Sequence, residues 1–182
     1  MCSVNEFNRS ELLDNKDIIE VAIHSDFATC EYERDGQTAI DRYCKGKHWE
    51  SETERSVAEA LQESYTSLFR VESTQSETHR LRLTDLLGQG ESPLELFDLG
   101  LSQSADQGAL LFFRPVRLEE LTMTSGFALP FEEQYEDHLI EVYERTMKET
   151  ESDENPKPES VRRFYVFCRL HEKYGSFPLL NR

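Results

Sequence analysis

Arg114 is the residue whose type and position point most strongly to chemistry in this sequence. It directly follows the apolar run 109–113, whose composition is typical of a strand buried on both faces. A guanidinium in that place must reach the edge of the sheet or meet a hydrogen-bond acceptor. Asp85 and Asp98 each follow a strand-like segment, and we expect them to be its partners. Arg114 is then either a structural ion-pair centre or an anion-binding residue at the mouth of a barrel.

Trp49 and His138 are two further candidates. Trp49 is the only tryptophan and stands just before the helix start at Ser51, where it could anchor a partner or pack a corner between helices. His138 has Asp137 beside it and Glu141 three residues later, which would suit a metal ligand or general base. Its alternative is a histidine on the apolar side of a helix.

Ser102 belongs to a group of small turn residues that would shape the loops at the rim of the sheet, where binding commonly resides. The sequence contains no HExxH, GxSxG, GxxxxGK[ST] or EF-hand motif. No histidine has another histidine three or four residues away, and no two cysteines form a CxxC pair. We therefore expect no metal and no cofactor.

The net charge of −16, from 20 basic and 36 acidic residues, limits the partners. It disfavours direct binding to nucleic acid and to anionic membranes, which need cationic side chains. It permits a basic protein partner, although the charge could also serve solubility alone.

The four cysteines are far apart, and the N-terminus lacks the apolar segment of a signal peptide. We therefore expect free thiols and a cytoplasmic location. The sequence has no apolar run long enough to cross a membrane.

Apolar periodicity predicts helices, then strands, then helices within one domain of 182 residues. The helical lead-in covers 1–68, the β module 69–129, and the C-terminal helices 130–182. Four period-two segments and the apolar run that begins at residue 109, joined by short connections, favour an antiparallel meander, strongly twisted or curled into a small barrel. The expected strands are 69–72, 80–84, 94–96, 109–116 and 121–127. Because the strands are not interleaved with crossover helices, the fold class is α+β.

The two C-terminal helices are expected to have opposite charge. Residues 131–159 contain 11 acidic and 3 basic residues, whereas residues 160–182 contain 1 acidic and 5 basic residues. An antiparallel pair with complementary faces would follow, held mainly by its apolar stripes. The apolar tail Phe177–Leu180 is expected to dock on the fold.

Four segments between Gly36 and Phe131 carry a resemblance to a known group of proteins. They are LRLTDLLGQGE (81–91), the D-x-x-x-S segment 98–102, G-x-L-L-F-x-R (108–114) and Ser125-Gly126. In these the chain resembles a group of uncharacterised bacterial proteins with a helical lead-in and a strand-rich module. Some relatives have a cysteine-rich, SEC-C-type metal-binding tail, which this sequence lacks because its C-terminal region has only one cysteine. The resemblance implies a bacterial cytoplasmic protein but no reaction.

Two functional hypotheses remain from the sequence. The first is a non-catalytic acidic protein-binding or adaptor module, including an inhibitor of a basic protein. The second is a small hydrolase or metal-dependent enzyme, whose site would combine dispersed Asp, Glu and His residues with Arg114 or His138.

Overall fold

The computed structural model describes residues 15–90, 92–152, 154 and 156–176 of the chain. Its fold class is α+β, as expected. Helices precede and follow a five-stranded antiparallel sheet, which is open and not closed into a barrel. In the described part of the chain, no helix has the length and apolar character needed to span a membrane.

Four of the five strands form where apolar residues alternate with polar ones, and β4 forms on the continuous apolar run. They are β1 (Ser67–Gln75), β2 (Arg80–Asp85), β3 (Leu94–Phe97), β4 (Leu110–Arg117) and β5 (Thr122–Phe131). In β2 and β3 the burial of the side chains alternates strictly along the strand. β4 is buried from its first residue to its seventh, which confirms the central strand predicted from its apolar run.

The strand order in the sheet is β3-β2-β1-β4-β5. The first three strands form a meander, but β4 then pairs with β1 and not with β3, so the order differs from that of a simple five-stranded meander. The short helix α4 (Leu99–Ser104) connects β3 to β4 and lies against β1 and β2. The sheet curls so far that the edge strands β3 and β5 contact each other.

The first helix of the fold, α1 (Asn15–Asp26), continues into the π-helical turn η2 (Phe27–Glu31). Helices α2 (Ala39–Gly46) and α3 (Glu52–Gln62) follow, each beginning at a hydroxyl cap. The Thr38 hydroxyl caps α2 in a reciprocal capping box, and Ser51 caps α3 as its sequence predicts. We call residues 32–63, which contain α2 and α3, the arm.

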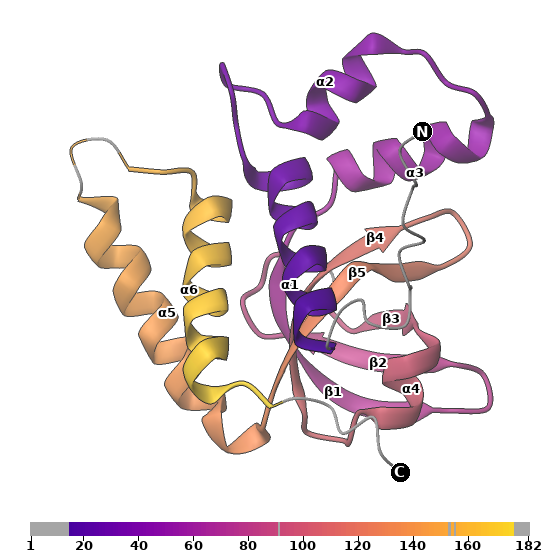
Figure 1. The fold of residues 1–182 in the computed structure, drawn as a ribbon. Coiled ribbons are helices and arrows are strands. Elements are labelled where there is room, and N and C mark those ends of the chain that lie inside the picture. Colours follow the sequence, from indigo (N-terminus) through magenta and orange to yellow (C-terminus); the bar gives the residue numbers. More distant parts are fainter. Residues whose placement is uncertain (1–14, 91, 153, 155, 177–182) are drawn as a thin grey trace, which may run out of the picture.

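The C-terminal part consists of a short 3₁₀ turn η3 (Glu133–Tyr135) and the helices α5 (Glu136–Glu151) and α6 (Glu159–Tyr174). The two helices pack side by side, as expected (Figure 1). Among the described residues no ion pair joins them. The Arg162 guanidinium of α6 links them, because it donates to the Met147 carbonyl and to the Thr150 hydroxyl near the end of α5, each at 2.9 Å.

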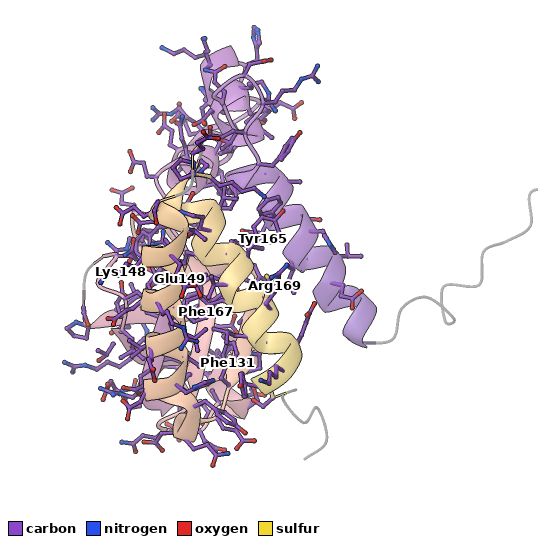
Figure 2. All side chains as sticks on the ribbon, turned by 90° about the vertical axis from the view of Figure 1, so that its left-hand side faces the viewer. Phe131, Lys148, Glu149, Tyr165, Phe167 and Arg169 are labelled. Atoms are coloured by element: carbon purple, nitrogen blue, oxygen red, sulfur yellow. The ribbon has the colours of Figure 1, made fainter. Side chains whose placement is uncertain are left out.

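Two hydrophobic layers hold the sheet. On one side, α1, α5 and α6 cover a core of aromatic and aliphatic residues that includes Phe112, Phe164 and Phe167. On the other side, the concave face of the curled sheet encloses Phe69, Phe113 and several leucines, with α4 packed against them. Figure 2 looks onto α5 and α6, with Phe167 in the layer between these helices and the sheet. The arm lies at one end of the sheet, where α3 contacts β4 (Figure 1).

Two helix boundaries differ from the sequence prediction. The helical lead-in was expected to run to residue 68, but α3 ends at Gln62, and Leu68 belongs to β1, where it is fully buried. The C-terminal helices were expected to begin at residue 130, but Phe131 is still the last residue of β5 and pairs with Leu110. In both places pairing within the sheet overrides a local helical pattern. The tail Phe177–Leu180 lies outside the described residues.

Candidate functional site

Arg114 is the centre of a buried polar cluster at the base of the arm. Its side chain is 2% exposed. Its Nε donates to both carboxylate oxygens of Asp26, at 3.0 and 3.1 Å. One terminal nitrogen donates to the Glu31 carboxylate, and the other donates to the carbonyl and hydroxyl oxygens of Ser64, each at 3.2 Å. The guanidinium of β4 thus binds two segments that are far apart in the sequence, residues 26–31 and Ser64.

The π-helical turn η2 brings the two carboxylates to one guanidinium. The Tyr32 N–H donates to the Phe27 carbonyl at 2.8 Å, which is the i→i+5 bond of a π-helix. Asp26 and Glu31 are likewise five residues apart. In a regular α-helix, residues with that spacing point in clearly different directions. The wider turn places both on the side that faces β4.

A bulge in β5 lies opposite Arg114. Phe113 pairs with Ala128 and Pro115 pairs with Thr124, so Arg114 alone is opposite the three residues 125–127. Pro115 has no N–H to donate there, and Gly126 has the positive φ of 116° that glycine tolerates. The Ser125 side chain lies near Asp26 and works to lower the pKa of that carboxyl.

The charges of the cluster are unequal, with two carboxylates facing one guanidinium. Burial raises the pKa of Asp26 and the nearby charge of Glu31 adds to this effect, while Arg114 and Ser125 oppose it. Burial alone would lower the pKa of Arg114. The two nearby carboxylates outweigh this effect and hold the pKa above its ordinary value. The cluster therefore contains a permanent cation, and its partner Asp26 takes up a proton more easily than an exposed aspartate does.

The cluster fastens both ends of the arm. Glu31 is the last residue before the arm, and Ser64 is the first residue after it, and both bind the same side chain. Thr66, two residues further on, is fully buried and accepts a hydrogen bond at 3.4 Å from Arg163 of α6. The chain is thus anchored to β4 and α6 where it leaves and where it re-enters the body of the fold.

The expected partners of Arg114 were wrong. Asp85 instead organises the loop after β2, where it accepts hydrogen bonds from the N–H groups of Leu87 and Gly90, at 3.0 and 2.9 Å, and from the Ser67 hydroxyl. Loop amides and a neighbouring hydroxyl satisfy this carboxylate, so it does not reach the arginine.

Asp98 and Ser102 lie together in the short connection between β3 and β4. Asp98 caps α4 by accepting from the Leu101 N–H at 2.8 Å, and the Thr124 hydroxyl of β5 donates to it at 3.4 Å. The Ser102 hydroxyl is buried and donates to the Leu99 carbonyl at 3.0 Å. These contacts are typical of local structural roles.

Trp49 lies in the connection between α2 and α3, whereas His138 lies on α5. Trp49 is half-buried, packs against the small arm core of Ile40, Cys44 and Ala58, and meets Tyr43 edge-on at 5.5 Å. His138 is exposed on α5 and meets the Tyr174 ring at 4.9 Å. Neither residue contacts Arg114 in the described structure, so the six sequence candidates do not form one site.

The sequence analysis missed Asp26, Glu31 and Ser64. Asp26 and Glu31 lie inside an apolar helical pattern and are buried, at 7% and 3% exposure. A buried acid in such a pattern is a signal for a cationic partner, and two of them spaced by five residues would have indicated a π-turn. Ser64 lay in a segment interpreted as helix.

The cysteines and the possible metal ligands can be described for the same part of the chain. Cys30, Cys44 and Cys168 are free. Burial raises the pKa of Cys30 to about 11 and that of Cys168 to about 12, so both thiols are protonated at neutral pH. No three His, Cys, Asp or Glu side chains of the described residues are grouped as metal ligands.

The exposed surface of α5 and the turn before it is strongly acidic. Glu133, Asp137, Glu141 and Glu144 recur at steps of four, four and three, so they lie along one side, and all four are exposed. We call these four residues the acidic stripe. Glu136 is not part of it, because Arg70 of β1 binds its two carboxylate oxygens at 2.8 and 3.1 Å.

A comparison with family models assigns the chain to a family. Residues 7–180 match the model of DUF7986, a family of unknown function. The chain belongs to the DUF7986 family. The DUF7986 match takes in the arm, the sheet and both C-terminal helices, which is more than the half of the chain that carries the resemblance to an uncharacterised group. No curated protein and no solved structure matches the chain.

Proposed function

We propose that this member of the DUF7986 family is a non-catalytic protein-binding module of the bacterial cytoplasm, and that it presents the acidic stripe to a basic protein partner. The observation that carries the proposal is the stripe itself. Its four carboxylates are exposed, and within the described structure none of them forms an ion pair. α6 and the shared hydrophobic core support the helix that presents most of them.

The packing of α5 against the rest of the fold supports this proposal. Leu139 and Tyr143 of α5 are buried against the aromatic layer, while the stripe occupies the opposite side. A fixed row of like charges attracts a complementary cationic surface over a distance and speeds association. Each exposed pair would contribute about 0–1 kcal/mol, so the affinity must come from several pairs together. The same negative field disfavours direct binding to nucleic acid.

The placement of the candidate catalytic groups also supports a non-catalytic role. Arg114 is buried and its guanidinium is occupied by Asp26, Glu31 and Ser64. His138 is exposed on α5 beside Tyr174. A hydrolase built from dispersed residues would need Arg114 or His138 to share a cavity with carboxylates.

Affinity capture with charge-reversed variants tests the proposal. The tagged protein is incubated with cytosolic extract at low and at physiological salt, and each protein that co-purifies in stoichiometric amount is then purified and titrated against it. The test variant reverses Glu133, Asp137, Glu141 and Glu144 to lysine. The matched control reverses four exposed acidic residues outside α5, which are Asp106, Glu77, Glu119 and Glu120.

We expect a basic protein that binds the wild-type chain and the control variant but not the stripe variant, with affinity that falls as salt rises. Equal binding of that partner by the stripe variant would overturn the assignment of the surface. The absence of any stoichiometric partner at either salt would overturn the adaptor function.

A further inference from the structure

A cavity of about 630 Å³ lies between α2 and α3, on one side of the arm. Its volume falls in the range of about 300–1,000 Å³ that is usual for small-molecule sites. Every residue that lines it belongs to the arm, between Gly36 and Gln62. It is thus separate from both the acidic stripe and the Arg114 cluster.

The carboxylates that line this cavity are already engaged within the arm. Asp41 accepts from the Thr38 N–H and hydroxyl, at 2.9 and 2.8 Å, and from the Gln62 amide at 3.0 Å. These hydrogen bonds, with the one from Gln62 foremost, lower the pKa of Asp41, so it stays ionised and satisfied. Glu59 pairs with Arg55 at 3.6 Å.

Two cations of the lining have no such partner. Lys45 lies in the last turn of α2 and Lys47 is its left-handed C-cap, and both are exposed. In the described structure neither lysine has a carboxylate partner. One lysine would be enough to offset the helix dipole at this end. The pair leaves the cavity with positive charge that its own carboxylates do not neutralise.

Trp49 supplies an apolar wall next to these lysines. The indole is half-buried and is fixed by its edge-on contact with Tyr43 and by the arm core beneath it. A flat aromatic wall beside ammonium groups suits a ligand that has a planar apolar body and an anionic head.

We propose that this cavity binds a small aromatic anion, with its carboxylate or phosphate on Lys45 and Lys47 and its ring against Trp49. This site is independent of the proposed protein-binding function, because it uses different residues and the opposite sign of charge. Carboxylate and phosphate share the chemistry that the two lysines recognise, and separate probes distinguish them.

The fluorescence of Trp49 reports on the site directly, since the chain has one tryptophan. The full-length protein is titrated with benzoate and with phenyl phosphate, and with benzylamine and benzyl alcohol as cationic and neutral controls of similar shape. We expect a saturable change with at least one anion and none with the controls. A response to all four probes, or to none of them, would overturn the proposal.

Substitution of the lysines separates recognition from general electrostatics. Lys45→Gln with Lys47→Gln should weaken binding of the anion by about tenfold or more. The matched control is Lys148→Gln with Arg169→Gln, which removes the same charge from exposed positions on α5 and α6 (Figure 2) and also includes a lysine in the last turn of a helix.

The control variant should bind the anion as tightly as the wild type does. Equal weakening in the test and control variants would show that only net charge matters, and it would overturn the site. Lys45→Arg with Lys47→Arg keeps both charges and the helix end. It should retain saturable binding, which ties the loss in the glutamine variant to the charge of the two lysines. Unchanged affinity in the glutamine variant also contradicts the proposal.

Discussion

Glu31 and Ser64, which flank the arm at its two ends, bind the same guanidinium of Arg114. The arm itself has only three buried residues in its core, namely Ile40, Cys44 and Ala58. Such a small core cannot fix the arm on its own. Its position relative to the sheet therefore depends on this one side chain of β4 and on the segments next to it.

Replacing Arg114 by methionine should lower the free energy of unfolding by about 3–5 kcal/mol, because it leaves the buried carboxylates of Asp26 and Glu31 without a cation. Denaturant unfolding monitored by circular dichroism measures the loss. The triple variant with Asp26→Asn and Glu31→Gln should recover part of it, since no buried charge then remains. A loss below about 0.5 kcal/mol in the single variant would show that the guanidinium is exposed in solution.

The pH dependence of stability should carry the signature of Asp26. Burial raises its pKa above the ordinary value of 3.8, so the folded protein holds a proton at pH values where the unfolded chain has released it. The contribution of Asp26 to stability therefore falls as the pH rises from about 3.8 through the raised pKa.

Unfolding of the wild type and of Asp26→Asn across the acidic range isolates this contribution. The wild type should lose stability relative to the variant as the pH rises, and the difference should then level off. The control is Asp106→Asn, in an exposed turn. The difference in stability between the wild type and this variant should show no comparable slope with pH. If the wild type instead gained stability relative to Asp26→Asn as the pH rises, the ion pair with Arg114 would outweigh burial in setting the pKa of Asp26.

Gly108→Ala should destabilise the turn before β4 by about 1–3 kcal/mol. Gly108 has φ +88°, and an added Cβ would lie 2.5 Å from a carboxylate oxygen of Glu133. Thermal unfolding measures the change. Gly46→Ala in α2 is the matched control, because its Cβ would meet only an ordinary contact at 3.9 Å, and it should be neutral or slightly stabilising. Equal effects of the two substitutions would contradict the strain at Gly108.

Phe167→Ala should cost about 3–5 kcal/mol of stability, because it opens a cavity between α6 and the sheet. Phe167 is fully buried and stacks on Phe112 with ring centroids 4.4 Å apart. Tyr165→Ala, two residues earlier on the same helix, is the control. That side chain is 45% exposed and should cost clearly less. A similar loss in both variants would contradict the finding that Phe167, and not Tyr165, lies on the side of α6 that faces the sheet.

The elements that the sequence predicts well are those set by local pattern. Alternation of apolar and polar residues predicted four of the strands, the apolar run predicted β4 and its central position, and Ser51 was recognised as the start of α3. The strand order was less accessible. The pairing of β4 with β1 depends on how α4 crosses the sheet, which no local pattern records.

The candidate site was predicted only in part. Arg114 was recognised from its buried position, but its partners were sought at neighbouring strand ends. Asp26 and Glu31 meet it only because a π-turn breaks the ordinary helical period, and Ser64 meets it only because α3 ends early. A prediction from periodicity assumes regular helices and strands. It therefore cannot find contacts that form where a helix or strand departs from regular geometry.

The anchoring of the arm has a topological consequence. Because the chain departs at Glu31 and returns at Ser64 within reach of one side chain, the arm is geometrically an insertion in an otherwise continuous fold. A short linker joining these two points would have little distance to span. The sheet, α1, α5 and α6 would then form a minimal scaffold, onto which arms of other lengths could be grafted at the same point.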